Sequence, residues 1–117
     1  MGRRSDLVAL DFPEDKNGNA LRRKFEEGDD LSVPRPIDFY FAFDERQQAL
    51  GFAAVVEERD LHVCISSDEQ QEGWLVIVTR HMVPTHASIT ELESSLTERA
   101  RSAGGEADGW GCLPVDP

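Results

Sequence analysis

Long apolar runs, cysteines and positive charge are all scarce in this chain of 117 residues. No apolar stretch approaches the roughly 20 residues that a membrane-spanning helix needs. The basic residues Arg3 and Arg4 near the start are followed by acidic residues and not by the apolar centre of a signal peptide. We therefore expect no membrane association and a cytoplasmic location.

Only two cysteines, Cys64 and Cys112, and three histidines, His62, His81 and His86, are present. Two cysteines so far apart form neither a disulfide framework nor a metal-binding or redox pair. A zinc site needs three or four convergent ligands, and no ligand spacing of that kind occurs around the histidines. The sequence therefore predicts reduced cysteines, no metal and no cofactor.

The charge is strongly negative, with 12 basic residues against 23 acidic ones and a formal net charge of −11. A phosphate backbone is repelled by such a surface, and nucleic-acid binders normally carry a basic patch. The one basic cluster, at residues 22–24, is followed at once by Glu26 and Glu27. We expect no direct nucleic-acid binding. An acidic surface suits a basic protein partner, although it can also serve solubility alone.

The chain is long enough for one small domain, and we expect a polar N-terminal tail over residues 1–16 and a single domain over 17–117. Three helices are predicted within that domain. The first spans residues 20–27 after a turn and a cap at Asn19, and Gly28 ends it. The second runs from a cap at Asp44, with Gln47 as its capping-box partner, to about Arg59. The third begins at a cap on Ser88 and ends at Gly104.

Four strands are predicted from alternating or continuous apolar residues: 37–43, 61–66, 74–83 and a returning strand around Trp110. The apolar run from Trp74 to Val78 suggests a central strand. The order of elements is the split βαβ pattern of a ferredoxin-like α+β domain. In it, a four-stranded antiparallel sheet carries two helices on one face, here with a short helix added at the N-terminus. The second and fourth strands would form the edges and hold the two cysteines too far apart for a bridge.

The run from Gly104 to Cys112 ends the last helix and brings Trp110 back to the sheet. Gly104 and Gly105 reverse the chain, and Asp108 with Gly109 gives a second turn signal. The glycine spacing also suggests a nucleotide-binding loop. Such loops precede a helix and present its N-terminus to phosphate, whereas these glycines follow one. A structural role is therefore favoured.

Several segments between Asn17 and Cys112 resemble the regulator of ribonuclease activity B family. They are residues 17–23, 28–32 with Pro34 and Arg35, 38–41, 82–85 with Ile89 and Thr90, and 104–111. The closing run is the most specific, and its motif residues are Gly104, Gly105, Asp108, Gly109, Trp110 and Gly111. The resemblance implies a ferredoxin-like fold. It also implies an acidic cytoplasmic protein that binds the endoribonuclease ribonuclease E and lowers its activity without acting on RNA.

The first functional hypothesis is thus a non-catalytic regulator that binds a basic region of a larger protein, itself a monomer or a weak homodimer. Acidic residues around the second strand are the expected contacts: Glu57, Glu58, Asp60, Asp68, Glu69 and Glu72. The same charges could instead keep a solvated sheet edge from aggregating.

Two alternatives come from other classes of protein. One is a ligand-binding or self-assembling domain that uses the open sheet face around Tyr40, His62 and Cys64. The other is a small nuclease in which His81 or His86 acts as acid or base and Arg80 holds a phosphate. In the structural interpretation, these histidines only bond loose backbone groups beside Pro84.

Overall fold

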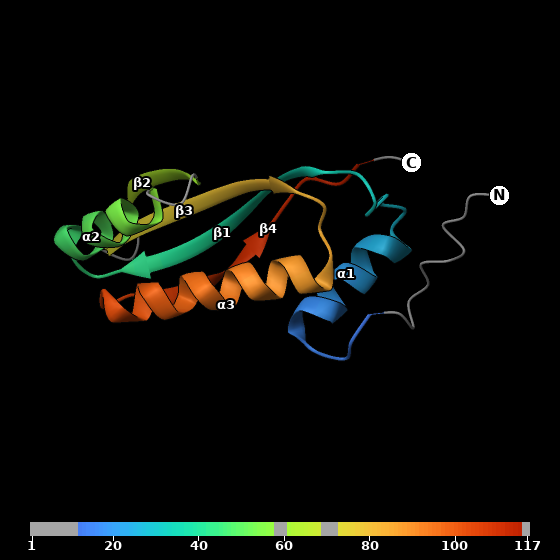
Figure 1. The fold of residues 1–117 in the computed structure, drawn as a ribbon, viewed down its shortest axis with the longest axis horizontal. Coiled ribbons are helices and arrows are strands. Elements are labelled where there is room, and N and C mark those ends of the chain that lie inside the picture. Colours follow the sequence, from blue (N-terminus) through green and yellow to red (C-terminus); the bar gives the residue numbers. More distant parts are fainter. Residues whose placement is uncertain (1–11, 58–60, 69–72, 116–117) are drawn as a thin grey trace.

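The fold is an antiparallel four-stranded sheet accompanied by three helices within the described residues (Figure 1). The computed structural model describes residues 12–57, 61–68 and 73–115. The elements in chain order are α1 (Lys16–Glu26), β1 (Arg35–Phe43), α2 (Arg46–Glu57), β2 (His62–Asp68), β3 (Gly73–Met82), α3 (His86–Ser102) and β4 (Glu106–Gly111). The strands lie in the order β2-β3-β1-β4. The α+β class and the antiparallel sheet are as the sequence predicts.

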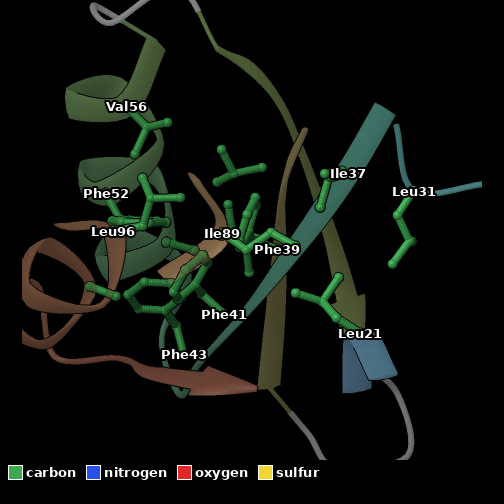
Figure 2. Packing of buried hydrophobic residues seen from close by; sticks show 14 of the residues in the cluster. Leu21, Leu31, Ile37, Phe39, Phe41, Phe43, Phe52, Val56, Ile89 and Leu96 are labelled. Atoms are coloured by element: carbon green, nitrogen blue, oxygen red, sulfur yellow. The ribbon is translucent and has the colours of Figure 1, made fainter. Parts of the chain in front are cut away.

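The core lies between the sheet and the helices α2 and α3. The alternating side chains Ile37, Phe39, Phe41 and Phe43 of β1 are all buried, because a strand turns every second residue to the same face. The ring of Phe52 from α2 lies with its centroid 5.1 Å from that of Phe41 and 5.3 Å from that of Phe43. Ile89 and Leu96 of α3 complete this cluster (Figure 2).

The strands confirm the sequence patterns to within two residues at most ends. β3 is central, as predicted, and its residues Val76 and Val78 are fully buried. Leu75 and Ile77 on its other face are only half-buried, so the strand is not covered on both sides. β2 and β4 form the two edges, and Cys64 and Cys112 are free thiols.

The first helix begins earlier than predicted, and the turn and cap assigned to Asn17–Asn19 were wrong. Asp15 is the N-cap, and its Oδ1 accepts a 2.7 Å hydrogen bond from the amide of Gly18. Gly28, with φ of 95°, ends the helix as expected. Phe12, in the predicted tail, is buried with its ring centroid 5.9 Å from that of Phe25. The rest of that tail, residues 1–11, lies outside the described residues.

The predicted caps of the other two helices were also misplaced. The N-cap of α3 is Thr85, and Ser88 is the third helical residue, which completes a capping box with it. At the start of α2, the side chain of Gln48, and not Gln47, accepts a hydrogen bond from the amide of Glu45. In both helices, the residue at which the preceding segment ends decides which side chain can accept a hydrogen bond from a free amide at the helix N-terminus.

The prediction that Asp108 and Gly109 form a turn was wrong as well. Both residues lie within β4, where the pairing with β1 shifts between Phe39, opposite Trp110, and Phe41, opposite Ala107. This shift is a β-bulge, and Gly109 adopts φ of 98° in it. The two residues do bend the chain locally, but they do so as a bulge within a paired strand and not as a turn between elements.

A buried ion pair holds the loop between α1 and β1 against the C-terminal segment. Nη1 of Arg35 lies 2.8 Å from the carboxylate of Asp29, and both side chains are almost completely buried. Asp29 also accepts a hydrogen bond from the amide of Val115, and Arg35 donates to the carbonyl of Leu113. The pair thus fixes residues that follow β4 beside residues that precede β1.

Candidate functional site

Two of the six acidic residues expected to contact a partner lie within the described residues. Glu57 is the exposed last residue of α2, and Asp68 is the last residue of β2, opposite Gly73 of β3. The other four, Glu58, Asp60, Glu69 and Glu72, lie outside the described residues. Of these six residues, the structure therefore describes one at the end of a helix and one at the end of the edge strand.

The open sheet face brings together Tyr40 and Cys64, two of the residues of the alternative site. Tyr40 of β1 and Cys64 of β2 both pair with Ile77 of β3, so the three side chains form one row across the sheet. His62 lies in the next row, opposite Thr79. α2 and α3 pack on the other face, and this row joins an aromatic ring, an aliphatic side chain and an exposed thiol.

Tyr40 is the described residue of this face whose ionisation is most affected by its surroundings. Partial burial, the nearby charge of Asp38 and the thiol of Cys112 raise the pKa of the Tyr40 hydroxyl above its usual value. Asp38 itself accepts a 2.6 Å hydrogen bond from the hydroxyl of Thr79. Tyr40 therefore stays a neutral hydrogen-bonding group on this face at physiological pH.

Three of the four glycines in the closing motif, Gly104, Gly105 and Gly109, occupy positions where a larger residue would clash or be strained. A side chain on Gly105 would meet the ring of Phe43 at 2.3 Å, so only glycine lets β4 approach β1 there. Gly104 and Gly109 have φ of 94° and 98°, which other residues rarely adopt. A β-carbon on Gly111 would lie in ordinary contact with the Tyr40 hydroxyl, at 3.7 Å. These contacts place the last strand.

Trp110 and Asp108 complete the motif in different ways. Trp110 lies opposite Phe39 in the sheet, and its half-buried indole donates a hydrogen bond to Asn17 of α1, whereas Asp108 is exposed in the bulge. Asn17 is 6% exposed, and its amide nitrogen also donates to Thr90 and Glu93 of α3. The most specific motif of the chain thus joins β4, α1 and α3.

The residues of the nuclease alternative are not brought together. Arg80 pairs with Ile37 and His81 with Pro36, so these two neighbours point to opposite faces of β3. His86 lies at the start of α3, where its Nε2 is 2.9 Å from the carboxylate of Asp15. Among the residues that the structure describes, no group of three histidine, cysteine or acidic side chains could hold a metal ion.

A comparison with protein families matches residues 14–112 to the model described as regulator of ribonuclease activity B. The chain belongs to this family. A search of curated proteins finds no match. The region matched to the regulator of ribonuclease activity B family runs from the capping segment of α1 to Cys112, so it includes both ends of the Asn17–Trp110 contact. The family resemblance drawn from the sequence is thereby confirmed. None of the helices in the described ranges is long and apolar enough to cross a membrane.

Sequence reasoning missed three residues that build this arrangement. Asn17 was interpreted as part of a turn, although it lies in a segment of the regulator of ribonuclease activity B resemblance. Asp29 and Arg35 carried no signal as a pair, because a buried ion pair six positions apart has no periodic pattern. The two prolines that flank Arg35 were the only indication that its backbone is held in an extended conformation.

Proposed function

We propose that this chain is a non-catalytic cytoplasmic regulator that binds a ribonuclease and lowers its activity by protein–protein contact. The observation that carries the proposal is the family match over residues 14–112. The net charge of −11 supports a protein partner and disfavours direct contact with RNA. By family resemblance, the partner is an endoribonuclease of the ribonuclease E type.

We further propose that the partner contacts the acidic residues around β2. These are Glu57, Glu58, Asp60, Asp68, Glu69 and Glu72. Opposite charges across such an interface accelerate association and select among partners, and the contribution falls as salt is added. The binding region on the ribonuclease should therefore be rich in lysine and arginine.

The test uses the purified protein, ribonuclease E from the same organism and a ribonuclease E substrate RNA. The protein should slow cleavage and should leave the RNA intact when the ribonuclease is omitted. Replacing Glu57 and Asp68 by lysine should weaken binding. The matched control replaces Glu26 and Glu91, which are exposed on α1 and α3, by lysine; it changes the net charge equally and should leave binding stronger than in the first variant. Equal affinity of all variants at low salt would contradict the proposed contacts, and RNA cleavage by the protein alone would contradict the non-catalytic role.

We also assign the domain to the ferredoxin-like folds. The strand order β2-β3-β1-β4 and the position of one helix between β1 and β2 and another between β3 and β4 support this assignment. Fold alone does not set function, because domains of this type serve many purposes.

A second candidate function is ligand binding or self-association through the open sheet face. The row formed by Tyr40, Ile77 and Cys64 favours it, because an aromatic, an aliphatic and a thiol side chain lie together on the face opposite to the one on which α2 and α3 pack. Gel filtration with Cys64 modified by a bulky maleimide separates the two functions. A homodimer that dissociates on modification favours the second, and a monomer that still inhibits the ribonuclease favours the first.

A further inference from the structure

Within the part of the chain that the structure describes, no strand pairs with the outer edge of β2. β2 pairs with β3 alone, and among the backbone hydrogen bonds of the described residues none reaches its other edge. An edge strand leaves every second residue with its N–H and C=O directed away from the sheet. Those groups match the hydrogen-bonding pattern of one more extended chain, which is how many domains bind peptides.

Among the described residues, the opposite edge of the sheet carries more protective features than the β2 edge does. β4 has six residues, carries a bulge at Gly109, and exposes the charged residues Glu106 and Asp108. Bulges and charges are the features with which proteins prevent further strands from pairing. β2 runs for seven residues in unbroken register with β3, and the stretch 62–67 contains no proline, lysine or acidic residue.

Two apolar side chains of β2 are incompletely covered. Val63 and Ile65 pack against the core but are only half-buried, whereas their partners on β3, Val78 and Val76, are fully buried. The difference arises because the β3 residues have a strand on either side. An added strand would supply the missing neighbour on the helix-facing side of the sheet.

The helix above this edge also presents an apolar side chain. α2 packs mainly on β2 and β3, α3 packs mainly on β4, both helices also contact β1, and Val55 lines the groove between the two helices. Helical geometry places Leu50 and Glu57, seven residues apart, on the opposite flank of α2, above the β2 edge. Leu50 is 41% exposed.

We propose that the β2 edge binds an extended, basic segment of the ribonuclease as a fifth strand of the sheet. The inference rests on the proposed function and specifies how the partner is held. The added strand would pair its backbone with β2, and its helix-facing side chains would cover Val63, Ile65 and Leu50. Glu57 and Asp68, at the end of α2 and of β2, favour positive charge on that segment. A second copy of this chain would instead bring like charges together.

Amide hydrogen exchange measured by mass spectrometry, on the full chain with and without intact ribonuclease E, tests the binding mode. In the complex, the exchange rate of amides in residues 62–68 should fall to about one tenth of its value in the free protein, or lower. The protected segment of the ribonuclease should be rich in lysine and arginine. Binding that leaves residues 62–68 unprotected, or that protects an acidic ribonuclease segment, would overturn the fifth strand while the regulatory function stands. Absence of any binding would overturn both.

A matched pair of variants separates the β2 edge from the groove between the helices. Leu50 and Val55 are equally exposed, at 41% and 40%, on opposite flanks of the same helix. Leu50→Lys should weaken ribonuclease binding by about tenfold, and Val55→Lys should change it by less than about twofold. The reverse result would place the partner in the groove lined by Gly51, Val55 and Arg99 and would refute the proposal.

Proline substitution tests the backbone pairing itself. Successive amides of a strand point to opposite edges, so one of Val63→Pro and Cys64→Pro removes an amide of the free edge and the other an amide bonded to β3. The former should remain folded and lose ribonuclease binding. Full affinity in the folded variant that lacks the free-edge amide would contradict strand addition. A homodimer whose residues 62–68 are already protected in the free protein would show that a second copy occupies the edge and would also overturn the proposal.

Discussion

The indole nitrogen of Trp110 donates a 2.9 Å hydrogen bond to the side-chain oxygen of Asn17, 93 positions earlier in the chain. The amide nitrogen of Asn17 donates in turn to the hydroxyl of Thr90 and to the carboxylate of Glu93. One buried side chain thus joins α1, α3 and β4. Both residues of the Asn17–Trp110 contact lie in segments that carry the family resemblance.

Removal of Asn17 should destabilise the domain. Asn17→Ala leaves the half-buried indole N–H of Trp110 without its acceptor, and we expect a loss of about 1–3 kcal/mol in the free energy of unfolding. Urea unfolding of Asn17→Ala, Trp110→Phe and the double variant provides the measurement. The two losses should be less than additive, because each variant breaks the same bond. Additive losses would show that the two residues are not energetically coupled.

Trp110→Ala should cost less than the roughly 3–5 kcal/mol of a fully buried aromatic residue, because the ring is half-buried.

Two glycines should respond in opposite directions to the same substitution. Gly105→Ala places a β-carbon 2.3–2.7 Å from the ring atoms of Phe43, so the chain must shift, at a cost of about 1–3 kcal/mol. Gly51→Ala lies in α2, meets no atom within 4 Å, and should stabilise the protein by about 1 kcal/mol. Thermal unfolding of both variants checks the pair. A stabilised Gly105→Ala variant would mean that β4 is less tightly placed than the contacts indicate.

The buried pair Asp29–Arg35 should be costly to break from one side. Arg35→Met leaves the carboxylate of Asp29 buried without its counter-charge, and we expect a loss of about 3–5 kcal/mol. The double variant Asp29→Leu with Arg35→Met should lose less than the two single variants together. Equilibrium unfolding of the three variants measures this coupling. If Arg35→Met costs less than about 1 kcal/mol, the pair does not hold the C-terminal segment as described.

The carboxylate of Asp15 should make stability depend on acid pH. A hydrogen bond from the amide of Gly18 lowers its pKa most, followed by the hydrogen bond and the charge of His86. Because the folded pKa lies below the usual 3.8, the contribution of Asp15 is present above that value and is lost as the pH falls through the folded pKa. Asp15→Asn should therefore unfold at a lower temperature than the natural chain at neutral pH, and the two should converge in acid. A difference that stays constant from neutral to acid pH would contradict this role.

Features that depend only on residues close together in the chain could be predicted from the sequence. The alternation from Ile37 to Phe43 predicts β1 and its buried face, because side chains of a strand point alternately to either side whatever the rest of the chain does. Gly28 and Gly104 mark helix ends for an equally local reason, since both take positive φ. The family resemblance likewise follows from short runs of residues.

The failures of sequence reasoning have a common physical cause. Asn17–Asn19 has the composition of a turn, yet it is helical because Asp15 caps it and Asn17 bonds to Thr90, Glu93 and Trp110. Asp108 and Gly109 also suggest a turn, but pairing with β1 makes them a bulge. In each case a contact between residues far apart in sequence outweighs the local preference.

The sequence by itself determined the order of the elements, the face of each strand that is buried and the acidic charge, because these properties depend on residue type and spacing along the chain. Only the tertiary structure decided that β4 is bulged whereas β2 keeps an unbroken register, and that Leu50 lies on the flank of α2 away from α3. Those properties depend on which strands pair and where the helices pack, and hydrogen bonds and contacts between residues distant in the chain set both.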